Sequence, residues 1–439
     1  MLVPSSRLLA AFALLVLPAA AVARYAGAGA LASGWIGFVL CIFLLDAFVG
    51  RSRLAGIGVT GPELIRMWKG RASTLDLSVR NLNPATRRIR IGPAPPEGLT
   101  LDPEELTITL GPSQTARLTW TATPSQRGRY PVERCVLETP SPLGFWAIRG
   151  SALLTVEIRV YPDLSSTQKL STVFLRRGHV GSYPQRQIGR GREFEKLREY
   201  SFGDGFDEVD WKATARRGRP ITRVFQVERT QEVYVILDAS RLTARPISTG
   251  SPDSILERNI TAALLLALEA EKQGDHFGLI TFSDRIHGFV RARGGKAHYG
   301  ACREALYALQ PRIVTPDFDE LGTLLRLRLR RRALLVFLTE LDDPILAESF
   351  LRNAGLIRRN HLMLVGMMQP PGSRPLFEEQ VSPGGDIYEN LAGHLQWSKL
   401  RTFAKVLERE GIQFLLCQPD RIASQLASVY VNLKRRQAL

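Results

Sequence analysis

The chain has 439 residues, which is long enough for two or three domains with separate hydrophobic cores. Its formal net charge is +16, but basic residues are mixed with acids along the whole length and no recognition motif accompanies them. The charge therefore does not indicate specific nucleic-acid binding, and it suits a protein that faces anionic lipid. The four cysteines lie far apart without a C-x-x-C pair, which argues against a zinc site or a disulfide framework.

Two apolar stretches open the chain and predict a pair of transmembrane helices within residues 1–53. The first covers residues 8–23, and the second covers about 26–49. The second is long enough to cross about 30 Å of hydrocarbon. A cleaved signal peptide is the alternative for the first stretch. Because the second stretch follows almost at once, the sequence favours a helical hairpin.

Arginines around these stretches predict the direction of the hairpin. Arg7 precedes it, Arg51 and Arg53 follow it, and Arg24 alone lies in the turn. Positive charge is retained on the cytoplasmic side of a membrane helix. We therefore expect both ends of the hairpin, and the domains that follow, in the cytoplasm.

Residues 54–162 predict a β-sandwich domain. Short stretches of alternating polarity, such as 74–79, 106–110 and 116–122, are separated by turn residues. No catalytic constellation lies among them. The domain is therefore interpreted either as a binding or spacer module or as a packing platform for the domain that follows.

Residues 232–439 predict an α/β domain, because apolar strands alternate with helical segments. The first strand ends in Asp238-Ala239-Ser240, which places polar groups where open α/β sheets bind ligands. The predicted strands are 233–238, 276–282, 333–339, 361–367 and 412–417, and the predicted helices are 253–273, 297–309, 317–331, 344–356, 397–411 and 419–434.

The connector between these domains, residues 163–231, carries the motif Arg-Glu-Tyr-x-x-Gly-Asp-x-x-x-x-Val-Asp-Trp-Lys-Ala-x-Ala-Arg at positions 198–216. This string closely resembles the DUF58 family, and segments 127–130, 142–146 and 159–162 look like the upstream β region of that family. The resemblance extends over nearly the whole chain. It implies a von Willebrand factor A-like α/β domain behind the sandwich and a membrane anchor.

The motif residues are interpreted as a partner-binding surface. We expect the Trp211 ring to bury against the α/β domain, and Asp204 and Asp210 to lie within reach of Arg216 or Arg223. The predicted surface comprises Gly203, Asp204, Asp210, Trp211 and Arg216.

The resemblance also implies a cation site of the kind that A-type domains build from a D-x-S-x-S loop and oxygens of two later loops. Hard oxygen ligands suit Mg²⁺. Leu242 stands where the second serine belongs, and Arg241 brings an opposing charge. We therefore predict a degenerate site that binds Mg²⁺ weakly. The alternative is that Asp238 and Ser240 only cap the helix or order the loop. The predicted ligands are Asp238, Ser240, Thr315 (with Thr323 as the alternative to Thr315) and Glu340.

The sequence favours an interaction protein over an enzyme, since no H-E-x-x-H, G-x-S-x-G or Walker motif occurs. The resemblance implies an adaptor that works with a MoxR-type AAA+ ATPase and unidentified client proteins, in complex assembly or envelope maturation. It implies a multi-pass protein of the bacterial inner (cytoplasmic) membrane. The alternative is a metal-dependent hydrolase that uses the Asp238 edge of the α/β domain.

Overall fold

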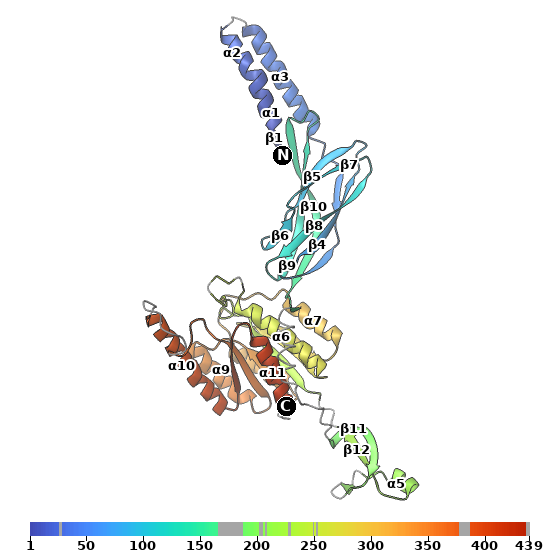
Figure 1. The fold of residues 1–439 in the computed structure, drawn as a ribbon, viewed down its shortest axis with the longest axis vertical. Coiled ribbons are helices and arrows are strands. Elements are labelled where there is room, and N and C mark those ends of the chain that lie inside the picture. Colours follow the sequence, from blue (N-terminus) through green and yellow to red (C-terminus); the bar gives the residue numbers. More distant parts are fainter. Residues whose placement is uncertain are drawn as a thin grey trace. The chain divides into compact units, whose positions relative to one another are not determined.

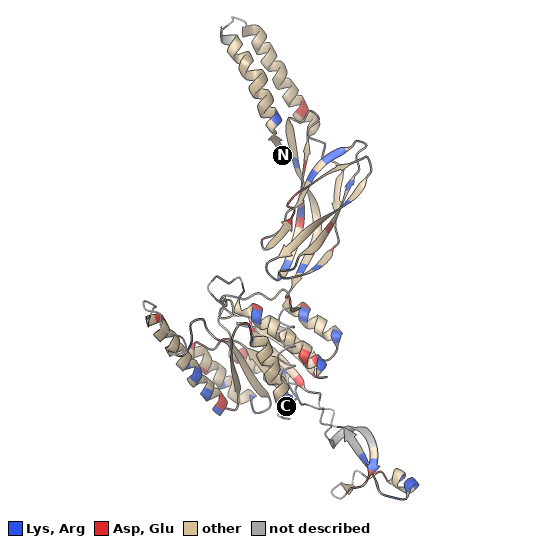
Figure 2. Cartoon of the chain, viewed as in Figure 1, with Lys and Arg blue, Asp and Glu red and all other residues tan. Residues whose placement is uncertain are grey.

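A computed structural model shows two compact units, Met1–Asp163 and Leu164–Leu439 (Figure 1). Basic and acidic side chains are distributed over both, as the mixed charge of the sequence predicts (Figure 2). The residues that the structure describes are 1–25, 29–165, 188–201, 205–206, 209–226, 230–248, 250–251, 253–376 and 387–435.

The first unit begins with a short strand and two apolar helical segments that lie side by side (Figure 1). Strand β1 (Leu2–Pro4) leads into α1 (Ser6–Ala11), a π-helical turn (Phe12–Val16) and α2 (Leu17–Tyr25); α3 is Gly29–Gly50. Pro18 has no N–H to donate to the preceding turn, which accounts for the π-helical turn just before it.

Helix α3 has the length and composition of a membrane-spanning helix. At 22 residues it is about 33 Å long, and among the described residues it is the one helix that is long and apolar enough to cross a membrane. The other segment, Ser6–Val22, is a shorter apolar run. The two pack through Val16, Val39 and Phe43. A hairpin that crosses the membrane twice thus stays a prediction.

Two β-sheets share one hydrophobic core and make up the rest of the first unit. One sheet has the order β1-β10-β9-β5-β7, with β3 paired to β10, and the other has the order β2-β4-β8-β6. Alternate residues of β4, among them Leu75 and Leu77, are fully buried. They pack against Trp120 of the neighbouring strand in the same sheet and against strands of the other sheet. The strands are β2 (Ile57–Thr60), β3 (Leu64–Trp68), β4 (Ser73–Asn81), β5 (Arg87–Pro93), β6 (Leu99–Asp102), β7 (Leu106–Leu110), β8 (Thr115–Pro124), β9 (Gly128–Pro140) and β10 (Trp146–Tyr161).

A buried carboxylate joins α3 to the sandwich. Asp46 is 3% exposed, and its oxygens accept hydrogen bonds from the Ser141 hydroxyl (2.5 Å) and from the backbone N–H groups of Leu143 (2.9 Å) and Phe145 (3.3 Å). The next residue of the turn, Trp146, donates its indole N–H to the carbonyl of Phe43 at 2.9 Å. The turn between β9 and β10 therefore holds the last turns of α3. We call this turn, residues 141–146, the socket.

The second unit contains a six-stranded sheet with helices on both faces. Its order is β15-β14-β13-β16-β17-β18, and every pair is parallel except β14–β15. Helices α6, α7 and α11 share a core with one face, and α8, α9 and α10 share a core with the other. The strands are β13 (Glu232–Asp238), β14 (His276–Phe282), β15 (Ile286–Arg293), β16 (Ala333–Leu338), β17 (Leu362–Met368) and β18 (Gln413–Cys417); the helices are α6 (Ile255–Lys272), α7 (Lys296–Leu306), α8 (Phe318–Arg328), α9 (Pro344–Ile357), α10 (Ile387–Arg409) and α11 (Ile422–Arg435).

The sequence did not predict β15, which returns from β14 through a tight turn and forms an antiparallel edge. It also placed the start of α10 at residue 397, ten positions after the observed start at Ile387. The connector contains a two-stranded ribbon of β11 (Ile188–Glu199) and β12 (Ile221–Gln226), with helix α5 (Trp211–Arg217) before β12.

Replacing Asp46 with alanine should weaken the contact between α3 and the sandwich. The buried Ser141 hydroxyl would lose this acceptor, at about 1–3 kcal/mol for a buried group, and the partly buried N–H groups of Leu143 and Phe145 would lose it at a smaller cost. We expect the free energy of unfolding of the full chain in detergent to fall by about 2–4 kcal/mol. Amide hydrogen exchange should rise at residues 141–146.

The matched control is Glu133→Ala, which removes an exposed carboxylate from the same sandwich and should change stability by less than about 0.5 kcal/mol. An unchanged unfolding midpoint for Asp46→Ala would mean that the socket does not hold the helix.

Candidate functional site

The carboxyl ends of β13 and β16 form a buried polar region of the second unit. These neighbouring strands lie at the centre of the sheet, where the connections leave in opposite directions. Ligands of open α/β sheets bind at such a switch point. Asp238 ends β13, and Thr339 and Glu340 follow β16. We call Asp238, Ser240, Thr339 and Glu340 the Asp238 edge.

Asp238 is fully buried, and the protein satisfies both of its oxygens. Oδ1 accepts the backbone N–H of Ser240 at 2.8 Å, and Oδ2 accepts the hydroxyl of Thr339 at 2.7 Å. Burial raises the pKa of Asp238, although these hydrogen bonds and the charge of Arg245 act in the opposite direction. The carboxylate therefore orders the loop and ties it to β16.

Glu340 is a second buried carboxylate at this edge. It is 1% exposed, and its Oε1 accepts the backbone N–H of Met368 at 3.1 Å. Burial raises its pKa to about 8, although this hydrogen bond and the Arg245 charge lower it. The nearby cation comes from Arg245, which holds Asp342 with two hydrogen bonds of 2.7 and 3.1 Å. No pattern in the sequence predicts this position of Arg245.

Three of the predicted magnesium ligands, Asp238, Ser240 and Glu340, already accept hydrogen bonds within the protein. The Ser240 hydroxyl accepts the N–H of Leu242, and Leu242 itself packs in the core. Thr315 is exposed, although its loop lies beside the Asp238 loop through a hydrogen bond from the Arg241 N–H to the Val314 carbonyl. Over the described ranges, no three His, Cys, Asp or Glu side chains come together as a metal site. Binding of Mg²⁺ to these residues stays a prediction.

Part of the connector motif builds the short helix α5. Asp210 caps its N-terminus by accepting the Ala213 N–H at 2.9 Å, and its other oxygen lies 3.3 Å from Nε of Arg223, as the sequence predicts. Gly218 closes the helix with φ +68°. The Thr214 hydroxyl then accepts the N–H of Ile221 at 3.0 Å, which ties the helix to β12.

The prediction that Trp211 is buried is wrong, because 64% of its surface is exposed. The small core of the connector is filled instead by Val209, Ile221 and Thr222. Trp211, Lys212, Ala215 and Arg216 are all exposed, and their i,i+4 spacing places them on one side of α5. We call these four residues the α5 face.

Two of the five predicted partner-binding residues, Gly203 and Asp204, lie outside the residues that the structure describes.

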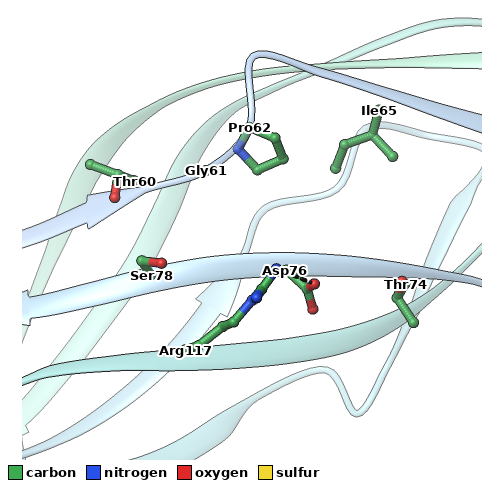
Figure 3. Close-up of a pocket in the computed structure, with 8 residues that line it drawn as sticks. All are labelled: Thr60, Gly61, Pro62, Ile65, Thr74, Asp76, Ser78 and Arg117. Carbon is green, nitrogen blue, oxygen red and sulfur yellow. Dashed lines mark hydrogen bonds and ion pairs between the residues drawn. The ribbon is translucent and has the colours of Figure 1, made fainter.

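The sandwich has a hollow of about 420 Å³, but its polar groups bind one another (Figure 3). Arg117 reaches across to Asp76 at 2.9 Å, and Thr119 donates to the same carboxylate at 2.6 Å. Because the protein already engages this carboxylate, we do not interpret the hollow as a ligand-binding site.

These features define a mixed α/β protein with an apolar N-terminal helix of membrane-spanning length. Residues 196–372 match the model of the family described as "Protein of unknown function DUF58", which confirms the resemblance for that segment. The sandwich and the N-terminal helices lie outside the matched residues.

Curated relatives agree with this match. "Uncharacterized protein Rv1480" of Mycobacterium tuberculosis (strain H37Rv) and "Uncharacterized protein Mb1516" of Mycobacterium bovis are each 26% identical over 198 residues, which is 45% of this chain. The aligned segment covers 58% of the length of each relative.

Among solved structures, the SpRpn10 VWA domain covers 45% of this chain and 93% of its own, at 11% identity and a TM-score of 0.30. The ASH/PapD-like domain of human CEP192 covers 25% of this chain and 87% of its own, at 12% identity and a TM-score of 0.19. TM-scores this low do not establish a shared fold.

Glu340 should make stability depend on pH. Because its pKa is higher in the folded protein than in the unfolded chain, its contribution is greatest below about pH 4.5 and is lost as the pH rises towards about 8. Glu340→Gln keeps the acceptor for Met368 and removes the titration. We expect the variant to gain on the order of 3–5 kcal/mol relative to the unmodified protein between about pH 5 and pH 8.

Chemical unfolding of both proteins across that range measures the effect. Glu348→Gln on α9, an exposed glutamate, is the matched control and should follow the unmodified protein. Parallel curves for Glu340→Gln and the unmodified protein would contradict the raised pKa.

Proposed function

We propose that this chain is a membrane-anchored interaction protein and that the α5 face binds its protein partner. The observation that carries the proposal is the exposure of Trp211 beside Lys212 and Arg216 on a helix whose cap and tie to β12 are otherwise satisfied. Exposed tryptophan and arginine are the side chains that dominate binding energy at protein interfaces. In the described part of the connector, neither Lys212 nor Arg216 has an acidic side chain within 4 Å.

The partner should present an apolar pocket and acidic groups, which would complement an indole and two cations. A MoxR-type AAA+ ATPase is the partner that the DUF58 resemblance suggests, with unidentified clients in complex assembly or envelope maturation. The α/β domain would then be of the von Willebrand factor A type. Its sheet order and its Asp238-x-Ser240 loop support this assignment.

Binding is favoured over hydrolysis at the Asp238 edge. The Asp238 carboxylate has no exposed surface, and both of its oxygens already accept hydrogen bonds. A general base must reach the proton that it removes. This geometry supports a structural role for Asp238.

Contacts at both ends of the helical pair support the proposal that the chain crosses the membrane twice. Strand β1 pairs with β10, with Leu2 opposite Ile148, while the far end of α3 is held in the socket by Asp46. Both ends of the helical pair therefore meet the same sandwich. If α3 crosses the membrane, the preceding segment must cross back. We infer a multi-pass protein of the bacterial inner membrane with its soluble domains in the cytoplasm, since Arg7, Arg51 and Arg53 would lie on that side.

Reporter fusions after Val49 and at the C-terminus test this topology. We expect cytoplasmic reporter activity at both positions, because the arginines flank the helical pair outside its turn. Periplasmic activity at either position would contradict the double crossing and favour a cleaved signal peptide.

Substitutions on the α5 face should remove the partner without unfolding the protein. Because their side chains are exposed, Trp211→Ala and Arg216→Ala should change the free energy of unfolding by less than about 0.5 kcal/mol. If both are central contacts, each should weaken binding by about 2 kcal/mol or more, roughly a thirtyfold loss. Affinity purification of the tagged full chain from membranes, with mass spectrometry of co-purified proteins, measures the loss.

Leu153→Ala is the matched control, since Leu153 is a large apolar side chain of the sandwich that is 85% exposed. If Trp211→Ala and Arg216→Ala both melt early, the motif is structural and the α5 face is not the binding surface.

A further inference from the structure

We infer that the first unit contains a binding site for the phosphate of an anionic phospholipid headgroup, at the end of the sandwich that carries α3. This inference rests on the membrane anchoring proposed above. The site is a cavity of about 320 Å³ whose lining residues include Arg7, Arg53, Arg87 and Arg88, together with Thr86 and Thr109.

Three separate parts of the chain bring these four arginines together. Arg7 lies in α1, Arg53 follows α3, and Arg87 and Arg88 open β5. The contact between Arg7 and the socket is close, because a Cβ added to Gly144 would lie 3.0 Å from the Arg7 guanidinium. Arg53 donates to the carbonyl of Pro140 at 2.8 Å. The same turn that receives Asp46 thus forms one wall of the cavity.

Among the described side chains, none of these four arginines forms an ion pair with a carboxylate. The Asp46 carboxylate acts on Arg53 through its charge, but its oxygens are already engaged by the socket, and Glu138 pairs with Arg90 and Arg149 instead. The Nε of Arg87 is buried and has no hydrogen-bond partner among the residues described. Burial and the neighbouring charge of Arg87 lower the pKa of Arg53. An anion in the cavity would relieve both the repulsion and the missing hydrogen bond.

The position of the cavity identifies the source of the anion. Arg7 and Arg53 flank the two apolar helical segments, at the level where lipid phosphates lie if α3 spans the membrane. Guanidinium groups bind phosphate oxygens through paired hydrogen bonds, and threonine hydroxyls add donors. A phosphodiester headgroup with its acyl chains along α3 meets all of these groups at once.

Thermal unfolding of the detergent-solubilised full chain with short-chain phosphatidylglycerol, below its micelle concentration, tests the site without a membrane. The melting temperature should rise with phosphatidylglycerol and not with short-chain phosphatidylcholine or inorganic phosphate. The double variant Arg87→Gln/Arg88→Gln should bind phosphatidylglycerol at least about tenfold more weakly, because each lost charged hydrogen bond is worth more than about 1.4 kcal/mol.

Arg66→Gln/Arg80→Gln is the matched control, since it removes two exposed arginines from other strands of the sandwich. Arg7→Gln provides a second test at an exposed position if the double variant does not fold. Equal shifts for the two lipids, an equal shift with inorganic phosphate, or full binding by the folded cavity variants would overturn the lipid site. Because no bilayer is involved, failure here is separate from failure of the topology, which the reporter fusions measure.

Discussion

The Asp46 carboxylate is the interaction on which the first unit depends. A helix as apolar as α3 has no polar side to offer a β-sheet domain, so one carboxylate with three donors replaces an extended interface. Burying this carboxylate costs desolvation free energy, which the three hydrogen bonds offset because all three donors come from one short turn. The geometry of that turn, residues 141–146, is therefore as important as the acid. Phe145 adds an aromatic contact to Phe43, with ring centroids 4.9 Å apart.

Neighbouring residues of the connector motif have different structural roles. Asp210 and Thr214 build and fasten α5 with side-chain oxygens that accept backbone N–H groups, and Gly218 ends the helix with its positive φ. Trp211 and Arg216 contribute nothing to that framework. Asp238 and Glu340 of the second unit show the opposite pattern, since their buried carboxylates accept hydrogen bonds from loops and strands of their own sheet. The proposed partner-binding side chains therefore lie on the connector and not at the Asp238 edge.

Much of the second unit follows from sequence pattern, because strands such as β13 are covered on both faces and read as unbroken apolar runs. Strand β15 is half-buried at an edge, so its mixed composition gives no such signal. Arg245 reaches the Asp238 edge from a loop, which no local pattern encodes. The position of Trp211 between Asp210 and Lys212 predicts that its ring buries against the α/β domain, but the ring is 64% exposed on a helix of seven residues. Asp46 is recognisable in the sequence as a lone carboxylate in an apolar run.

The pairing of β1 with β10 has a consequence for biogenesis. Leu2 leaves the ribosome long before Ile148, its partner across the strands, so β1 must wait for most of the sandwich to be synthesised. The apolar segments between them emerge before that partner strand. If those segments insert into a membrane, insertion precedes the pairing of β1 with β10, because the sheet closes over so long a separation in sequence.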